Sequence, residues 1–365
     1  MNLLIGINYI MKILIIENGY RDLVNSRYPL SDFFISKGHK VFYTCPTPPA
    51  NSGVYDLNIS RNKFSLYSLI KCVKNLVEIE NKESIDTILS FRLTSNILNY
   101  FSSFIGKKKN RTAVITGLGY AFTYNTSKYK FMKFIISFFY KIAEKRIKII
   151  AQNPDDLLDL DLSKSKVIFG SGITKPSSIV NNKNDSKHLK LLYVGRLLKS
   201  KGVEHAIETY KNVRKFNNKT KLIIAGGIDS ENPDTISTSY LDEIKNIKGV
   251  EYLSYVDNIQ EVYLNSDILL FPSIYREGVP RAIIEALSFG MTIITTNMPG
   301  CKETISNNGI FVKNDFVVEA TKYITSLSKE SLKDNSLKSL KLFDSKFSKE
   351  LIFTQYLDAI SAKTR

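Results

Sequence analysis

The sequence is poor in the residues that build covalent or metal-bound scaffolds. It has three cysteines and three histidines among 365 residues. Cys45, Cys72 and Cys301 are an odd number without a spacing pattern, so they predict neither a disulfide framework nor a zinc site. The histidines, at positions 39, 188 and 205, are too scattered to predict a metal cluster. We therefore expect a protein of a reducing cytoplasm, with no metal and no other cofactor.

Long hydrophobic runs are also missing. Within Lys128–Lys148 the longest uncharged stretch is Phe134–Tyr140, far short of the roughly 20 residues that cross a bilayer. Met1–Ile10 has no basic residue before its apolar run and no small-residue cleavage site after it, which argues against a secretory signal. We expect these ten residues to be a poorly packed extension before a first buried strand, Met11–Ile16.

Acidic residues are outnumbered by basic ones, 35 to 51, which gives a formal net charge of +16. Between Ile105 and Lys148 eleven basic residues stand against one acid, Glu144, so ten of the sixteen excess charges lie there. Such a surface suits nucleic acid, an anionic membrane face or an acidic substrate. Aromatic residues alternate with lysines in Lys128–Lys148, which favours a helix lying in a membrane interface over a core-packed helix with a solvated basic face.

The rest of the chain is organised around one stretch, Phe271–Ile305. A buried strand ends at Phe271, Gly278-Val279-Pro280 predicts the start of a helix, and Gly290 predicts its end. The helix N-terminus then lies at the carboxyl edge of a parallel strand, where α/β sheets bind ligands and backbone N–H groups attract phosphate.

Two carboxylates bracket this predicted helix. Glu277 precedes it, and Glu285 follows after seven intervening residues. Taken singly, each could be a solvated residue, with Glu277 complementing the helix dipole. Glu285, however, lies within Ala-Ile-Ile-Glu-Ala-Leu, where a charge is costly unless it is paired, and this favours a ligand-binding role.

A second motif follows the predicted strand Leu189–Val194. Arg196 and Lys201 flank a strand-to-helix turn, where a planar guanidinium and a compact ammonium can hold a diphosphate. Asp159-Leu160-Asp161 spells a metal-binding DxD, but it does not follow an apolar strand, so a helix end is the better interpretation.

Strands and helices alternate along the chain, which predicts parallel sheets covered by helices. The sequence thus predicts two doubly wound α/β domains, with a diphosphate-nucleotide site at the carboxyl edge of the second sheet. We place the first domain at residues 1–180, a polar linker at 181–188, the second domain at 189–345 and a terminal helix at 346–365.

The segment Arg-Glu-Gly-Val-Pro-Arg-Ala-Ile-Ile-Glu-Ala-Leu-Ser-Phe-Gly, residues 276–290, resembles the E-x7-E segment of the retaining glycosyltransferases of family 4. These enzymes have the GT-B fold, two Rossmann-like domains that face each other across a cleft. The resemblance is specific over residues 189–310 and looser in the first domain. It implies a first domain that binds the acceptor, a second that binds the nucleotide-sugar donor, and a C-terminal helix that packs back on the first.

The resemblance also implies roles for the residues of these motifs. Glu277 is expected at the donor sugar and Glu285 at the ribose hydroxyls. Arg196 and Lys201 would neutralise the leaving diphosphate, which dispenses with a metal.

Three further backbone positions and one loop complete the expected donor site. The N–H groups of Gly278 and Val279 would face the sugar and diphosphate. By the same analogy Gly19 lies under the diphosphate, and the turn at Val256 holds the base, for which uracil is expected.

Many family members carry a histidine near the loop that corresponds to Gly117–Tyr120, and this chain has none there. The string Thr-Gly-Leu-Gly-Tyr nevertheless resembles the branch that acts in bacterial surface-polysaccharide assembly. The resemblance implies transfer of a hexose or N-acetylhexosamine from a UDP-sugar to a glycan or polyprenyl-diphosphate-linked acceptor, in O-antigen, lipopolysaccharide or capsule synthesis. The enzyme would be cytoplasmic and peripheral on the inner face of the membrane, held by Lys128–Lys148.

Two alternatives remain open at the level of sequence. A UDP-sugar 2-epimerase has the same fold but needs further acid–base carboxylates and no acceptor. A basic nucleic-acid binder would use Ile105–Lys148 with salt-sensitive affinity, but it leaves the four charged residues of the two motifs unexplained. We therefore expect no nucleic-acid partner.

Overall fold

The computed structural model describes residues 9–57, 65–106, 109–176, 188–230, 232 and 234–362. Contacts divide the chain into two compact units. Unit 1 comprises Met1–Thr116, Lys133–Ile168 and Phe353–Arg365, and unit 2 comprises Gly117–Met132 and Phe169–Ile352. The expected extension at the N-terminus and the linker 181–188 fall, apart from their last residues, outside the described residues. The same holds for Lys107 and Lys108 of the basic segment.

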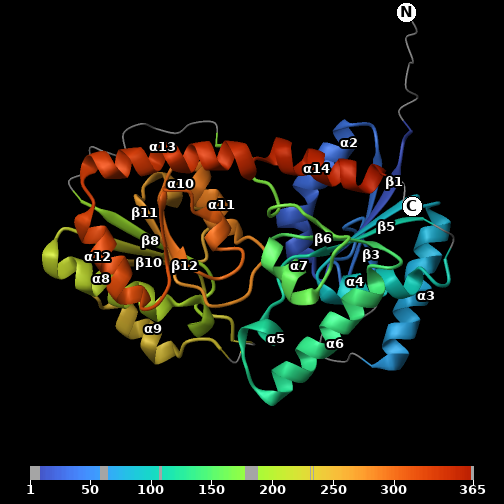
Figure 1. Ribbon diagram of the computed structural model, residues 1–365, viewed down its shortest axis with the longest axis horizontal. Coiled ribbons are helices and arrows are strands. Elements are labelled where there is room, and N and C mark those ends of the chain that lie inside the picture. Colours follow the sequence, from blue (N-terminus) through green and yellow to red (C-terminus); the bar gives the residue numbers. More distant parts are fainter. Residues whose placement is uncertain are drawn as a thin grey trace, which may run out of the picture. The chain divides into compact units, whose positions relative to one another are not determined.

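Unit 1 is built on a seven-stranded parallel sheet with the strand order β3-β2-β1-β4-β5-β6-β7 (Figure 1). The strands of four or more residues are rich in β-branched or aliphatic residues, as expected for strands covered on both faces. The strands are β1 (Lys12–Ile16), β2 (Lys40–Cys45), β3 (Tyr55–Asp56), β4 (Thr87–Phe91), β5 (Asn110–Ile115), β6 (Lys148–Ala151) and β7 (Lys166–Val167).

Helices cover both faces of this sheet. On one face, apolar residues of α3 and α4 pack against β1 and β4 in a single cluster. On the other, Phe353 of α14 contacts Phe33 of α2 with ring centroids 5.8 Å apart, and Tyr356 contacts Phe91 at 6.1 Å. The helices that lie wholly or partly in unit 1 are α1 (Tyr20–Asp22), the π-helical turn η1 (Leu23–Arg27), α2 (Tyr28–Ser36), α3 (Leu66–Lys82), α4 (Leu93–Ser102), α6 (Ser127–Ala143), α7 (Pro154–Leu160) and α14 (Lys349–Ser361).

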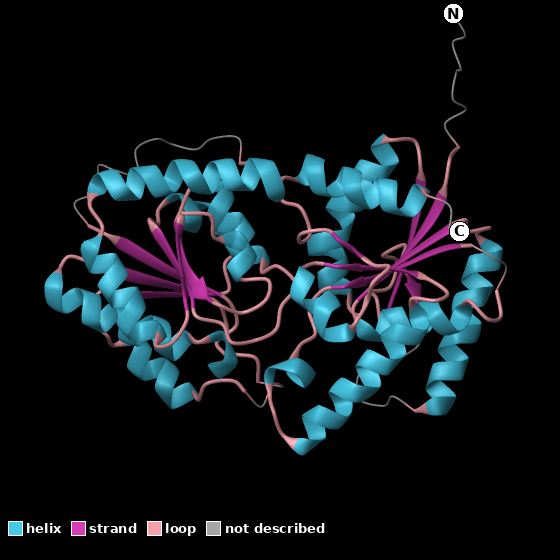
Figure 2. Cartoon of the chain, in the orientation of Figure 1, coloured by secondary structure: helices cyan, strands magenta, loops and turns pink. Residues whose placement is uncertain are grey.

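Unit 2 is built on a six-stranded parallel sheet with the order β10-β9-β8-β11-β12-β13. Figure 2 shows these strands enclosed by helices. The strands are β8 (Lys190–Val194), β9 (Lys221–Ala225), β10 (Val250–Ser254), β11 (Ile268–Phe271), β12 (Thr292–Thr296) and β13 (Gly309–Val312). The helices are α5 (Tyr120–Thr123), η3 (Lys199–Lys201), α8 (Val203–Phe216), α9 (Thr238–Lys245), α10 (Ile259–Leu264), α11 (Arg281–Ser288), η4 (Lys302–Thr304), α12 (Phe316–Ser326) and α13 (Lys329–Lys346).

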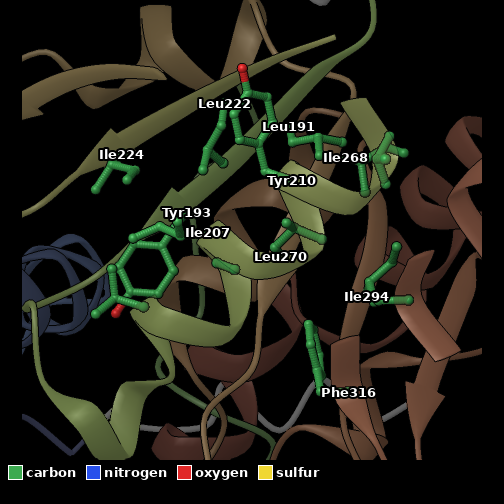
Figure 3. Close-up of a cluster of buried hydrophobic side chains, with 14 of the residues drawn as sticks. Leu191, Tyr193, Ile207, Tyr210, Leu222, Ile224, Ile268, Leu270, Ile294 and Phe316 are labelled. Carbon is green, nitrogen blue, oxygen red and sulfur yellow. The ribbon is translucent and has the colours of Figure 1, made fainter. Parts of the chain in front are cut away.

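Alternate residues of β8, β9, β11 and β12 belong to two separate cores, because successive side chains of a strand point to opposite faces. Leu191 and Tyr193 of β8 belong to the core under α8, α9 and α12. Leu192, between them, belongs to the core under α10, α11 and α13. Figure 3 shows part of the first core, where Ile207 and Tyr210 of α8 meet side chains of β8, β9 and β11. Both faces of the sheet are therefore covered by helices. The prediction of two doubly wound α/β domains is confirmed.

The strand orders define one switch point in each sheet. In unit 1 the chain leaves β1 toward β2 on one side and later enters β4 on the other. In unit 2 the corresponding neighbours are β8 and β11. Ligands of open α/β sheets bind beyond the carboxyl ends of such strand pairs, so these two edges are the places to look for sites.

Two local predictions can be compared directly with the structure. The helix predicted to start at Gly278-Val279-Pro280 begins later, at Arg281, and Pro280 is its N-cap in extended conformation. Pro280 has φ −62° and ψ 122°, so it precedes the first helical residue. The DxD string lies where a helix end was expected, because α7 closes at Leu160 and Asp161 takes a left-handed φ of 54°.

Candidate functional site

The carboxyl edge of β8 and β11 brings together the two motifs found in the sequence. Lys201 ends the short helix η3 that follows β8, and Glu277 lies in the loop that follows β11. Their side chains form an ion pair and are 13% and 20% exposed. Gly202 allows this approach, because its φ is +75° and a Cβ there would lie 2.3 Å from the carbonyl oxygen of Pro272.

The Lys201 ammonium has an aromatic surrounding. It lies 5.3 Å from the ring centroid of Tyr275 and 5.8 Å from that of Phe271. A cation at such distances is attracted by the ring quadrupole. The ammonium is therefore held by one carboxylate and two rings, in a position fixed before any ligand arrives.

Two wholly buried groups lie close enough to Glu277 to feel its charge. Burial, and then the Glu277 carboxylate, raise the pKa of the Cys301 thiol to about 12. Burial followed by Glu277 also raises the pKa of Tyr193, an effect that Arg196 opposes. The two charged residues Glu277 and Arg196 thus lie near the same buried tyrosine, whose hydroxyl donates to the Arg196 carbonyl oxygen at 3.0 Å.

Arg196 is the most open member of the predicted set. Its Nη1 lies 2.7 Å from Oδ2 of Asp229, and the two side chains are 53% and 31% exposed. Asp229 was not foreseen from the sequence, since it follows a different strand, β9. The two cations predicted to bind the diphosphate therefore have different acidic partners, Asp229 for Arg196 and Glu277 for Lys201.

Glu285 lies on α11 and has two partners. Its Oε1 is 2.7 Å from Nε of Arg281, one turn earlier, and its Oε2 accepts a hydrogen bond from the Tyr263 hydroxyl at 3.0 Å. Burial, and then Glu285, raise the pKa of Tyr263 well above its usual value. The Glu285 charge is thus paired within the protein, so its position among aliphatic residues does not by itself require a ligand, and its role at the ribose stays a prediction. The i,i+4 spacing of Arg281 and Glu285 was a usable signal for the ion pair, but the buried tyrosine had none.

The Gly117–Tyr120 loop lies directly on the Glu277 loop within unit 2. Gly117 has φ +108°, and a Cβ there would lie 2.6 Å from the Glu277 carbonyl carbon and the Gly278 nitrogen. The Gly119 N–H donates to the Arg276 carbonyl oxygen at 3.0 Å. Gly117 of this GxG motif is therefore required by backbone-on-backbone packing beside Glu277, whereas a Cβ at Gly119, whose φ is +61°, would meet the Tyr275 hydroxyl at 2.8 Å.

Aromatic side chains extend this contact. The rings of Tyr120 and Tyr275 meet edge to face with centroids 4.8 Å apart. Tyr120 also stacks with Tyr124, at 5.8 Å. Tyrosines thus surround the loop near which the resemblance implied a histidine.

The remaining predicted site residues are described by their backbone conformation and packing. Gly278 and Val279 lie in the buried loop before α11, and Gly300 packs so closely that a Cβ there would lie 1.7 Å from the Gly278 carbonyl oxygen. Val256 follows β10 and packs against the core under α10. Gly19 belongs to unit 1, and its φ of −169° is extended backbone that any residue adopts.

No group of three or more histidine, cysteine or acidic side chains that could hold a metal occurs in the described part of the chain. Asp161 of the DxD string instead forms an exposed ion pair with Lys141, which lowers the pKa of the Asp161 carboxyl.

The basic, aromatic segment forms the helix α6. Phe131, Phe134 and Phe138 recur on one stripe of this helix and are 65%, 66% and 59% exposed. Lys130 and Lys133, beside them, are exposed as well. Among the described residues, no helix has the length and apolar character needed to cross a bilayer.

Comparison with known proteins defines the class. Residues 175–340 match the family Glycosyl transferases group 1. An N,N'-diacetylbacillosaminyl-diphospho-undecaprenol alpha-1,3-N-acetylgalactosaminyltransferase of Campylobacter jejuni is 26% identical over 375 residues, which cover 95% of this chain and 97% of the relative. The capsular polysaccharide biosynthesis glycosyltransferase CapM of Staphylococcus aureus is 27% identical over 318 residues and covers 81% of each chain. A UDP-Gal:alpha-D-GlcNAc-diphosphoundecaprenol alpha-1,3-galactosyltransferase of Escherichia coli is 25% identical over 271 residues, 68% of this chain and 66% of the relative.

Solved structures share the fold. A glycosyltransferase from Rickettsia africae superposes with a TM-score of 0.77 at 18% identity and covers 97% of this chain and 98% of its own. HepE of Anabaena, in complex with UDP, gives a TM-score of 0.74 at 15% identity over 96% of this chain and 100% of its own. These likenesses show that the chain has the GT-B fold. Its residues 175–340 form a glycosyl transferases group 1 domain, which confirms the resemblance seen in the sequence.

Proposed function

We propose that this enzyme transfers a hexose or N-acetylhexosamine from a UDP-sugar, with retention of configuration, to a polyprenyl-diphosphate-linked or glycan acceptor. The observation that carries the proposal is the Lys201–Glu277 pair at the switch point of the second sheet. A cation held there beside a carboxylate provides one group for a diphosphate and one for a sugar. Relatives that act on undecaprenyl-diphosphate acceptors, and one of capsule synthesis, support the choice of surface-polysaccharide assembly.

In this proposal the two cations bind the donor diphosphate. Lys201 and Arg196 exchange their present partners, Glu277 and Asp229, for phosphate oxygens. Each of these contacts is made by a side chain that already lies at the carboxyl edge of the second sheet. Fixed positive charge is most useful where negative charge develops as UDP departs. This role needs no metal ion, because the ammonium and guanidinium supply the neutralising charge.

The acids then bind the polar parts of the donor. Glu277, once released by Lys201, accepts hydrogen bonds from sugar hydroxyls, and Glu285 accepts them from the ribose. The Gly278 and Val279 N–H groups face the sugar and diphosphate, and the turn at Val256 holds the uracil.

The chemical step is a displacement on one face of the sugar. The bond from the anomeric carbon to the diphosphate oxygen breaks, and a bond to the acceptor oxygen forms on the same face. The departing diphosphate takes the acceptor's proton, so no side-chain base is needed. A loop beside Glu277 without a histidine is compatible with this route.

The test is to incubate the purified protein with UDP-glucose, UDP-galactose and their two N-acetylhexosamine counterparts. We expect at least one of them to release UDP slowly without acceptor, and faster with a membrane extract that contains polyprenyl-diphosphate glycans. Product analysis with and without the extract separates the alternative enzyme class, because a 2-epimerase yields the C2 epimer of the sugar and is not accelerated by an acceptor, whereas slow hydrolysis by a transferase frees the donor's own sugar. If none of the four donors is turned over or protects the protein against thermal unfolding, the proposed donor class is wrong.

We further propose that the enzyme works on the cytoplasmic face of the membrane and docks there through α6. The exposed phenylalanine stripe would enter the interface while the neighbouring lysines meet anionic headgroups, each contributing about 1 kcal/mol. A lipid-linked acceptor would then be reached without extraction from the bilayer.

A further inference from the structure

Unit 1 has its own polar cluster at the switch point of its sheet. Glu17 follows β1, and Arg92 follows β4, the two strands between which the strand order reverses. Arg92 Nε lies 3.5 Å from Glu17 Oε1, and its Nη2 lies 2.8 Å from Asp22 Oδ1. This is the edge at which a doubly wound sheet binds its ligand.

The backbone of Arg92 is strained. Its φ of 71° and ψ of 162° fall in a region that is populated almost only by glycine and costs another residue about 1–3 kcal/mol. Its N–H donates to the Val114 carbonyl oxygen at 3.1 Å, and its carbonyl oxygen accepts from the Asn96 N–H at 2.9 Å. Neighbouring strands and helices thus hold an arginine where a glycine would fit without strain.

A buried ion pair next to Arg92 orients the Arg92 side chain. Glu17 is fully buried, and its Oε2 lies 2.8 Å from Nε of the nearly buried Arg27. The Arg27 guanidinium in turn lies 3.6 Å from the centroid of the Phe91 ring. Arg27 ends the five-residue π-helical turn η1, a form that is rare and frequent at functional sites.

The outer pair remains open to solvent. The side chains of Arg92 and Asp22 are 41% and 35% exposed, although the acid beneath them is buried. A guanidinium offers planar donors and a carboxylate offers acceptors. Arg92 Nη2 and Asp22 Oδ1 lie 2.8 Å apart. The pair therefore offers hydrogen-bond donors and acceptors side by side, which matches the adjacent hydroxyl groups of a sugar ring.

We infer that Arg92 and Asp22 bind the hydroxyl groups of the acceptor sugar and so determine which acceptor is used. The cluster of two arginines, Glu17 and Asp22 has no net charge, which suits a sugar and does not suit a diphosphate. That the bound sugar is the acceptor rests on the proposed glycosyl transfer, whereas the presence of a sugar-binding site at this cluster does not.

The test uses binding that needs no turnover. Saturation-transfer NMR is recorded on the full chain with methyl glycosides of glucose, galactose, N-acetylglucosamine and N-acetylgalactosamine. We expect at least one glycoside to give a signal that falls at least about fivefold in Arg92→Gly and Asp22→Asn. The signal should persist in Asp161→Asn, a matched change at an exposed carboxylate of unit 1.

Stability separates recognition from a structural role. Arg92→Gly removes the strain, so we expect its Tm to be unchanged or a few degrees higher. If the sugar signal is lost together with a fall in Tm, or if no glycoside gives a signal, or if both variants bind as the native protein does, the inference is wrong.

Kinetics supply the last distinction where a donor and an acceptor have been found. We expect the acceptor KM to rise at least about tenfold in Asp22→Asn while the affinity for UDP stays within about twofold. A diphosphate bound at this cluster would be helped by removal of the Asp22 charge, so a lower acceptor KM in this variant overturns the inference. Absence of any UDP-sugar turnover contradicts the proposed function instead, and leaves the NMR result to decide the sugar site.

Discussion

Lys201 and Glu277 form an ion pair across 76 positions of sequence. The pair joins the segment after β8 to the segment after β11, the strands at the switch point of the second sheet. Because both side chains are largely covered, the surroundings fix their positions better than those of an exposed pair. The pair is therefore the structural centre of the proposed donor site.

The first prediction concerns the charge of Lys201. Lys201→Ala should lower kcat roughly 100-fold, because removing one preorganised group from a site of developing charge commonly costs 10²–10³ in rate. The KM for the UDP-sugar should change much less. Initial rates of UDP release over a range of donor concentrations separate the two parameters. Lys175→Ala, which breaks an exposed ion pair in the same unit, is the control and should leave both unchanged. An equal loss in both variants would remove Lys201 from the site.

The second prediction concerns Glu285. Glu285→Ala should weaken UDP binding about tenfold, equivalent to the loss of one good polar contact. It should also lower stability by about 1 kcal/mol, because the buried Tyr263 hydroxyl loses the nearer of its two acceptors and keeps the Ala282 carbonyl oxygen at 3.3 Å. Titration calorimetry with UDP and urea unfolding measure the two effects.

Two variants separate these effects of Glu285. Tyr263→Phe removes the hydroxyl and should relieve the stability loss of the alanine variant without restoring UDP affinity. Asp242→Ala removes an exposed carboxylate of unit 2 and should alter neither quantity. Native UDP affinity in Glu285→Ala would show that the ribose lies elsewhere.

The third prediction concerns the loop that packs on Glu277. Gly117→Ala should lower both stability and kcat, because its Cβ would displace the backbone of Glu277 and Gly278. Gly38→Ala is a matched control, since Gly38 has a similar φ of +87° but nothing within 4 Å of the added Cβ. It should cost only the conformational penalty of roughly 1–2 kcal/mol and leave kcat unchanged. Equal kcat values in the two variants would contradict a role for this contact in placing Glu277.

Only some residues of the candidate site could be predicted from the sequence. Lys201, Glu277 and Glu285 were found because they stand in short, local motifs that follow apolar strands. Asp229 and Tyr263 were missed because each meets its partner only after distant segments fold together, and nothing near them in sequence marks the contact. Gly117 was visible as part of a GxG, but the motif alone does not say which backbone it lies against.

Unit 1 shows the same limit. Its strands could be predicted from hydrophobic runs, and so could the loop at Gly19. The strained backbone of Arg92 could not, because no residue pattern announces an arginine in a conformation that glycine prefers. Its position depends on hydrogen bonds to β5 and to α4, which exist only in the folded sheet.

The fourth prediction follows from the Cys301 thiol, whose pKa rises from an ordinary 9.0 to about 12 in the folded protein. Above about pH 9 the unfolded chain loses this proton first, so the free energy of unfolding should fall with pH by up to about 1.4 kcal/mol per unit. The contribution is fully present below pH 9 and is lost as the pH rises toward 12. Urea unfolding of the native protein and of Cys301→Ala over this range isolates it, because other titrating groups are common to both. Parallel curves would contradict the assignment.

The last prediction concerns membrane docking through α6. Phe134→Ser with Phe138→Ser should reduce binding to vesicles that contain phosphatidylglycerol by more than about tenfold, because each buried phenylalanine contributes about 1.5–3 kcal/mol. Phe216→Ser provides the control, since Phe216 is 74% exposed on α8 and is not part of the basic segment 105–148. Co-sedimentation measures the bound fraction.

Lys130→Gln with Lys133→Gln should weaken binding to anionic vesicles but not to neutral ones, because only headgroup attraction is lost. A core-packed helix with a solvated face predicts the opposite pattern, namely little vesicle binding by the native protein and no difference between the phenylalanine variants and Phe216→Ser.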